Sequence, residues 1–199
     1  MNSDPKAAKA QMRAQVGAKI RCISLEEMAR LSVQACALLK QQHLWIQARA
    51  VLFYAALRDE LDLSSLHPDA VAQQKAISFP QFNPERKEYV ACCAESAGQT
   101  MVRGKHGILE PPADAPVVPL NQLDLVLVPG VAFDLHGRRL GRGFGYYDRL
   151  LEKVCGIKCG VALDQQVEVE LPDEPHDARL DCILTPTRWL SFSGRAVLK

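Results

Sequence analysis

The sequence lacks any apolar stretch long enough to cross a membrane. No run approaches the roughly 20 residues that a bilayer span requires, and the charged stretch 6–19 is followed by no clean apolar segment of the kind found in signal peptides. These absences argue against an integral membrane protein and against a secreted one. We therefore expect a soluble, cytoplasmic protein without a membrane partner.

An ordered cysteine pattern is also missing. The seven cysteines are scattered and include no CxxC pair, so neither a disulfide framework nor a zinc site is expected. The adjacent residues Cys92 and Cys93 would point to opposite faces of a strand and cannot bind one ion together. Reduced cysteines that serve as small apolar residues fit this pattern and a reducing cytoplasm.

No excess of one charge is present either. The formal net charge is +1, from 24 basic and 23 acidic residues, which provides no basic field for nucleic acid. The chain shows no repeat, low-complexity tract or linker, and its 199 residues suit one large domain. We expect a single domain over residues 1–199 that acts as a monomer on small molecules.

What is present is an alternation of helical and strand patterns. Helices are predicted at 5–19, at 24–41 with a Ser24–Glu27 capping box, at 64–74 and at 145–154. Strands are predicted at 50–56, 76–79, 89–94, 123–130, 157–163 and 181–184. We expect Pro80 to end the second strand, and the third to form a hairpin-like pair with residues around Met101.

The predicted strands are apolar on both faces, as in parallel sheets that helices cover. We therefore predict an α/β fold, with a mostly parallel central sheet flanked by helices on both faces in a single domain.

A glycine-rich segment, GRGFGYYDR at 141–149, leads directly into a predicted helix. Alternate glycines allow positive φ, so that N–H groups converge on an anion near the positive end of the helix. Arg138, Arg139 and Arg142 would add phosphate-binding donors, and Asp148 is placed to hold Mg²⁺ against phosphate oxygens. A flexible turn explains GxGxG alone, but the neighbouring arginines, tyrosines and acid favour a nucleotide site.

Two common nucleotide motifs do not match this segment. In a dinucleotide-binding Rossmann fold the first glycine follows the strand at once and the spacing is GxGxxG. Here the polar loop DLHGRR intervenes and the spacing is GxGxG. A Walker A loop would end in Gly-Lys-Ser/Thr, which is absent. The segment therefore indicates a different phosphate site.

Several motifs resemble those of the 5-formyltetrahydrofolate cyclo-ligase family. The central one is VPGVAFDLHGRRLGRGFGYYDRLL at 128–151. The others, in chain order, are KAQMR at 9–13, RDELD at 58–62, GILEP at 107–111 and PHDARLDCILTP at 175–186. The resemblance thus covers most of the chain and implies ATP- and Mg²⁺-dependent closure of 5-formyltetrahydrofolate to 5,10-methenyltetrahydrofolate, with release of ADP and phosphate.

The resemblance also implies roles for individual residues. No covalent nucleophile is required, and Arg142 and Tyr147 would position the reactants. Mg²⁺ would be held by Asp148 and Asp177, and the folate by Ala55, Glu60 and Tyr146. ATP would be bound by Lys9, Arg13, Arg139, Leu140, Gly141, Arg142, Gly143, Phe144, Gly145, Tyr146 and Tyr147. Lys9 and Arg13 lie four apart, so both project from one helix face.

Several positions depart from the family pattern. Phe144 stands where relatives commonly carry glycine or lysine, and Ala55 offers only packing at a position that can contact substrate. Tyr146 and Tyr147 border the pterin in this hypothesis, although two aromatics that open a helix are also common in cores. The alternatives are a nucleotide-binding homologue that acts on another substrate or serves as a binding protein, and a Rossmann-type oxidoreductase.

Overall fold

The computed structural model describes residues 5–94, 101–104, 107–174 and 177–192. Its centre is an eight-stranded sheet in the order β13-β12-β10-β7-β1-β2-β3-β6. The strands are β1 (Ala50–Leu52), β2 (Ala76–Asn83), β3 (Glu88–Cys93), β6 (Val117–Val118), β7 (Leu125–Val128), β10 (Ile157–Val161), β12 (Cys182–Leu184) and β13 (Trp189–Ser191).

The central strands of this sheet run parallel. β12, β10, β7, β1 and β2 pair in parallel, whereas β13, β3 and β6 join antiparallel at the two edges. Successive residues of β7 serve opposite faces, because Leu125 and Leu127 belong to one hydrophobic core and Val126 and Val128 to the other. The predicted parallel sheet, buried on both faces, is therefore confirmed.

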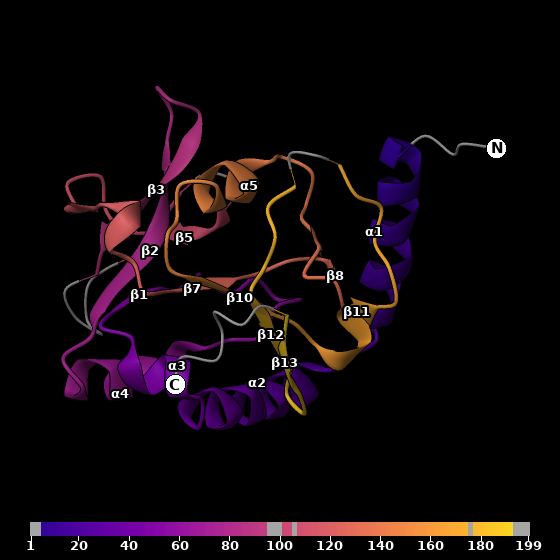
Figure 1. Cartoon of the computed structure of the whole chain (residues 1–199), viewed down its shortest axis with the longest axis horizontal. Helices are drawn as coiled ribbons and strands as arrows, with labels where there is room; N and C mark the ends of the chain where they lie inside the picture. Colours follow the sequence, from indigo (N-terminus) through magenta and orange to yellow (C-terminus); the bar gives the residue numbers. More distant parts are fainter. Residues whose placement is uncertain (1–4, 95–100, 105–106, 175–176, 193–199) are drawn as a thin grey trace.

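Helices cover both faces. The first core receives side chains from α1 (Pro5–Arg21), α2 (Leu25–Lys40), α3 (His43–Gln47) and α4 (His67–Ala72). The second core receives Leu150 and Leu151 from α5 (Tyr146–Leu151). Figure 1 shows α2, α3 and α4 below the sheet and α5 above it. Three short 3-10 helices complete the described helices: η1 (Ser64–Leu66), η3 (Leu120–Gln122) and η4 (Asp164–Gln166).

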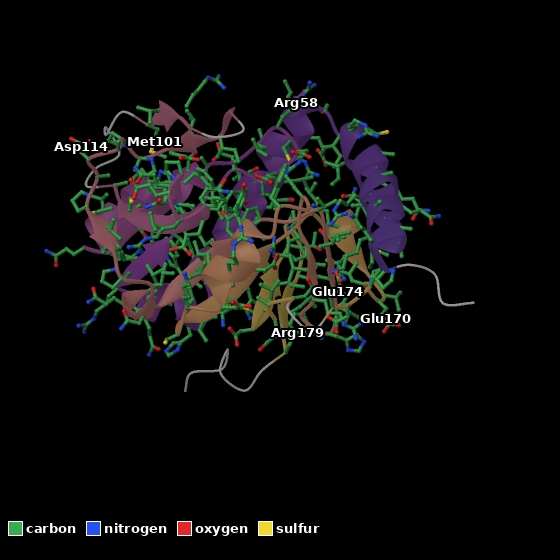
Figure 2. The ribbon with its side chains drawn as sticks, turned by 90° about the horizontal axis from the view of Figure 1, so that it is seen from above. Arg58, Met101, Asp114, Glu170, Glu174 and Arg179 are labelled. Atoms are coloured by element: carbon green, nitrogen blue, oxygen red, sulfur yellow. The ribbon has the colours of Figure 1, made fainter. Side chains whose placement is uncertain are left out.

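The first helix stands apart from the other helices. α1 packs against β8 (Ala132–Asp134) and η4 at one end of the sheet, and Glu174 lies on the same side of the molecule (Figures 1 and 2). Ser24 is the N-cap of α2, because its side chain accepts a hydrogen bond from the Glu27 N–H. The Glu27 carboxylate pairs with Arg30.

The prediction that Pro80 ends a strand is wrong. β2 continues through Pro80 to Asn83, where it pairs with Glu88 of β3. The bond from the Ala94 N–H to the Ile77 carbonyl sets the alternation of this antiparallel ladder and makes Pro80 part of a non-hydrogen-bonded pair. A proline at such a position removes no bond to β3, so the strand tolerates it.

The pairing predicted around Met101 is also wrong. β3 pairs with β2 and β6, whereas β4 (Val102–Arg103) pairs with β5 (Leu109–Glu110). A second small sheet contains β8, β9 (Arg139–Leu140) and β11 (Val167–Glu168). It carries the loop that separates β7 from the glycine-rich segment. Within the described ranges, no helix combines the length and apolarity needed to cross a membrane.

Candidate functional site

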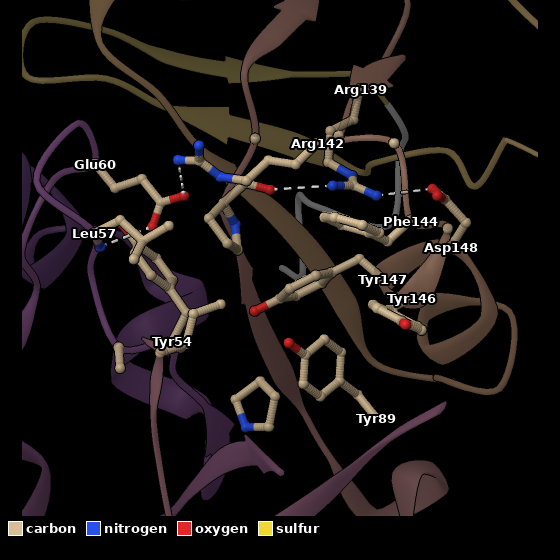
Figure 3. A pocket seen from close by; sticks show the side chains of 18 of the residues that line it. Tyr54, Leu57, Glu60, Tyr89, Arg139, Arg142, Phe144, Tyr146, Tyr147 and Asp148 are labelled. Carbon is tan, nitrogen blue, oxygen red and sulfur yellow. Dashed lines mark hydrogen bonds and ion pairs between the residues drawn. The ribbon is translucent and has the colours of Figure 1, made fainter. Parts of the chain in front are cut away.

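A cavity of about 290 Å³ opens beyond the carboxyl ends of the parallel strands β1 and β7. Carboxyl ends of parallel strands are the usual place for ligands in an open α/β sheet. The cavity brings together the turn after β1, parts of β2, β3 and β5, and the glycine-rich segment. Figure 3 shows its labelled side chains, among them Glu60, Tyr89 and Arg142. Its lining residues are Tyr54, Ala55, Leu57, Glu60, Pro80, Tyr89, Ile108, Leu109, Pro129, Gly130, Arg139, Gly141, Arg142, Gly143, Phe144, Gly145, Tyr146, Tyr147 and Asp148.

Residues 141–145, which we call the glycine loop, depend on glycine at two positions. Gly143 and Gly145 have φ values of 102° and 66°, a region that other residues rarely adopt. Gly145 is also the N-cap of α5. Arg13 of α1 stabilises the loop from outside, since its Nε donates to the Gly141 carbonyl over 2.8 Å. The glycines therefore present their main chain to the cavity, and anion binding by this loop stays a prediction.

Arg139 lies behind the glycine loop. Its side chain is only 3% exposed, and Nη2 lies 2.8 Å from Oδ1 of Asp148. Nη1 donates to the Pro129 carbonyl over 3.2 Å, and the guanidinium lies 5.4 Å from the centre of the Tyr147 ring. Arg139 thus fixes Asp148 and the end of β7 relative to each other, as Figure 3 shows.

Arg142 points across the cavity to the turn after β1. Its Nη2 lies 2.8 Å from Oδ1 of Asp59 and 3.0 Å from Oε1 of Glu60. The second oxygen of Glu60 accepts the Leu57 N–H over 3.0 Å. Burial raises the pKa of Glu60, and the neighbouring Arg142 opposes this shift. Glu60 is therefore a buried carboxyl with one cationic partner.

Aromatic side chains form one wall of the cavity. Phe144 and Tyr146 stack with centroids 5.8 Å apart and planes at 14°, and the Arg149 guanidinium lies 5.1 Å from the Tyr146 ring. The hydroxyl groups of Tyr89 and Tyr147 point into the cavity (Figure 3). Burial raises the pKa of Tyr89 to about 12 and raises the pKa of Tyr147 further. Both hydroxyls are therefore neutral donors near pH 7.

Lys9 forms a separate cluster with two acids. Its Nζ lies 2.7 Å from Glu174 and 2.7 Å from Asp177. Burial lowers the pKa of Lys9, but the hydrogen bonds that its ammonium donates to Asp177 and Glu174 outweigh this effect, so the net pKa is raised. The structure therefore places Lys9 and Asp177 together, while Asp148 lies with Arg139 at the cavity.

Each of the two predicted metal ligands is paired with a basic residue. Over the ranges that the structure describes, no group of three or more His, Cys, Asp and Glu side chains could hold a metal ion. His106 and His176, which border two of the family motifs, lie outside the described residues. Mg²⁺ binding by Asp148 and Asp177 stays a prediction.

Two predicted contributions to the phosphate site differ in the structure. Arg138 does not line the cavity, because its Nη1 lies 3.0 Å from Glu170 and 3.4 Å from the buried Asp134. The Leu140 side chain is buried in the first core, so only its main chain is available to a ligand. The tight loop between β8 and β9 directs Arg138 to this different partner.

Sequence reasoning missed part of the cavity wall. Tyr54 lies two residues beyond β1, a position that the predicted strand end could have indicated. Tyr89 and Pro80 reach the site from β3 and β2, and no motif marks them. Leu109 lies in the GILEP motif, but no role was predicted for it. Asp59 belongs to the RDELD motif, but its contact with Arg142 joins residues 83 positions apart, which the sequence alone does not bring together.

The fold and the cavity together define an α/β protein that presents a glycine loop and a buried acid at the carboxyl edge of a parallel sheet. Residues 5–186 match the sequence model of the 5-formyltetrahydrofolate cyclo-ligase family. The chain belongs to this family, as the sequence motifs predicted.

Individual relatives agree with this assignment. The 5-formyltetrahydrofolate cyclo-ligase of Haemophilus influenzae is 32% identical, with 87% of this chain and 97% of the relative covered. The enzyme of the same name from Escherichia coli is 29% identical over 84% and 94% of the two chains. The solved 5,10-methenyltetrahydrofolate synthetase of Aquifex aeolicus has 34% identity and a TM-score of 0.83, with 96% of both chains covered.

Proposed function

We propose that the protein catalyses the ATP-dependent closure of 5-formyltetrahydrofolate to 5,10-methenyltetrahydrofolate, with ADP and phosphate as the other products. One observation supports the proposal beyond the family assignment. The glycine loop, the long basic side chain of Arg142 and the buried acid Glu60 all line a single cavity. The glycine loop and Arg142 suit a polyphosphate. The Glu60 carboxylate suits a ligand that is rich in N–H donors.

On the phosphate side, the main chain of the glycine loop and the Arg142 guanidinium bind the nucleotide. Lys9 and Arg13 extend this site from α1, since Arg13 already contacts the Gly141 carbonyl. The Asp148 carboxylate lines the cavity and offers the oxygen ligand that Mg²⁺ prefers beside phosphates. We propose Asp148, with Asp177 as its partner, as the residues that hold Mg²⁺, which when bound neutralises charge on the transferred phosphoryl group.

On the folate side, Glu60 accepts hydrogen bonds from the donor edge of the pterin. Its burial makes an unpaired carboxylate unfavourable, so a ligand with matching donors gains affinity there. Tyr146 borders the ring, and Ala55 leaves room beside it because its side chain ends at Cβ. The stacked pair of Phe144 and Tyr146 supplies an apolar surface at the same wall.

The reaction proceeds without a covalent enzyme intermediate. The formyl oxygen attacks the γ-phosphorus and ADP leaves, which forms a carbon–oxygen–phosphorus linkage. N10 of the folate then bonds to the activated carbon, loses its proton, and the carbon–oxygen bond breaks as phosphate departs. Arg142 and Tyr147 position the reactants, so that catalysis consists of orientation and stabilisation of developing charge.

An absorbance assay for 5,10-methenyltetrahydrofolate tests this function. We expect product from 5-formyltetrahydrofolate only when ATP and Mg²⁺ are both present. Folded protein that forms no ATP-dependent product would contradict the proposal. Binding of ATP without binding of the folate would instead support a homologue with another substrate.

We further propose that the protein works in the cytoplasm as a monomer on these small molecules. The near-neutral net charge of +1 supports an absence of nucleic-acid partners. Light scattering during gel filtration tests the monomer, and a mass near twice the 22.0 kDa of one chain would contradict it.

A further inference from the structure

Arg142 connects two segments that the proposed reaction assigns to different ligands. It belongs to the glycine loop, and its Nη2 contacts Asp59 over 2.8 Å and Glu60 over 3.0 Å in the turn after β1. One nitrogen atom thus bridges two adjacent carboxylates, which we call the Arg142 bridge. Figure 3 shows the Glu60 contact across the cavity. Arg142 cannot keep both contacts and also turn its guanidinium fully toward a phosphate.

The two acids differ in how they respond when Arg142 leaves. The Asp59 side chain is 41% exposed, so water can solvate its carboxylate. The Glu60 side chain is 8% exposed and then retains only the Leu57 N–H. A buried carboxylate without a cationic partner is strongly unfavourable. When Arg142 moves to another anion, the Glu60 carboxylate therefore becomes unfavourable unless a ligand donates new hydrogen bonds to it.

We propose that Asp59 is a positioning residue that holds Arg142 on Glu60 in the empty protein and thereby couples the binding of the two substrates. The nucleotide withdraws Arg142 from the acids, and the folate satisfies Glu60 with its own N–H donors. Each ligand alone must break the Arg142 bridge, whereas the second ligand finds it already broken. The two ligands therefore bind with positive coupling. This inference rests on the proposed binding of ATP and folate in one cavity.

Asp59→Asn separates this role from a structural one. The substitution removes one charged partner of Arg142 at an exposed position and leaves Glu60 in place. It shifts the empty protein toward the open bridge, so each ligand alone binds more tightly and the coupling decreases. A residue that only stabilised the fold would weaken binding instead.

A matched control is available in the same turn. Asp62→Asn also removes one negative charge, but Asp62 contacts the Ser64 N–H rather than Arg142. An asparagine oxygen can accept the same bond. If Asp59 acted only through its long-range negative field on the nucleotide, the two variants would behave alike.

The experiment is calorimetric titration with the β,γ-imido analogue of ATP plus Mg²⁺ and with 5-formyltetrahydrofolate, each alone and in the presence of the other. For the wild type we expect at least a fivefold decrease in each Kd when the other ligand is present. For Asp59→Asn we expect each ligand alone to bind about threefold more tightly and the coupling to fall toward one. Asp62→Asn should match the wild type.

Three results would overturn the inference: no coupling in the wild type, equal coupling in Asp59→Asn, or equal effects of the two variants. Failure of the proposed function is distinguishable from these. If 5-formyltetrahydrofolate does not bind the wild type at all, the proposed function fails. The bridge is then judged from the nucleotide alone, where equal Kd values for wild type and Asp59→Asn contradict it.

Discussion

Ion pairs between single residues decide which charges the cavity offers to a ligand. Arg139 is buried and bound to Asp148, whereas Arg142 reaches the cavity from the loop. We therefore assign Arg139 mainly to orientation of Asp148, although its position in the motif suggested a direct phosphate contact. Arg142 is the arginine of the motif with a side chain placed to change partners.

Asp148→Ala and Arg142→Ala should each lower kcat by about 100-fold, because each removes a charge that acts on the phosphoryl group in the proposed reaction. The fold should persist, since both side chains lie at the cavity rather than in a core. Steady-state kinetics measure the loss, and circular dichroism checks the fold. Glu152→Ala, an exposed substitution one turn further along, serves as the control. Wild-type activity in both cavity variants would show that the phosphate site is misplaced.

Glu60→Gln should change how stability depends on pH. Burial raises the pKa of Glu60 in the folded protein above its ordinary value of 4.5. The folded state therefore holds this proton to higher pH than the unfolded state, so the free energy of unfolding falls as pH rises through that window. Glutamine does not titrate, so the variant does not lose this part of its free energy of unfolding. The Tm difference, variant minus wild type, should thus be more positive at pH 8 than at pH 4, by roughly 2–4 °C. A difference that is independent of pH would contradict the raised pKa.

At the scale of elements, the glycine loop and α5 form one unit because Gly145 begins the helix in a left-handed conformation. Gly145→Ala places a Cβ on a backbone with φ of 66°, which should cost about 1 kcal/mol and shift the loop. We expect KM for ATP to rise several-fold. Gly145→Asn should retain more affinity, since asparagine tolerates this conformation better. Equal KM values for the alanine variant and the wild type would show that the main-chain geometry of the loop is unimportant.

The elements also show what the sequence could predict. Apolar runs such as 123–130 identified the central parallel strands, because burial on both faces leaves a continuous hydrophobic signal. The antiparallel edge was harder to predict from the sequence. Whether β2 can contain Pro80 depends on which of its N–H groups face β3. The glycine loop was predictable from local spacing. Arg138 was misjudged because its partners, Asp134 and Glu170, are set by tertiary packing.

At the scale of the whole molecule, the proposed nucleotide site joins α1 to the glycine loop and to Glu174 and Asp177. A ligand that binds only the folded protein stabilises it by mass action, by about 2.7 kcal/mol at 100 times Kd. We expect Mg²⁺ with the imido analogue of ATP to raise Tm by roughly 5–10 °C for a chain of this size. Differential scanning fluorimetry measures the shift. An unchanged Tm at saturating analogue would contradict nucleotide binding.

The contact between Lys9 and Asp177 spans 168 positions of the sequence. During synthesis, Asp177 is therefore added 168 positions after Lys9. The nascent chain can pair β1 with β2 long before the cluster of Lys9 is completed. Nucleotide capture by the proposed site consequently requires both segments, and ribosome-bound fragments that end before residue 174 should consume no ATP.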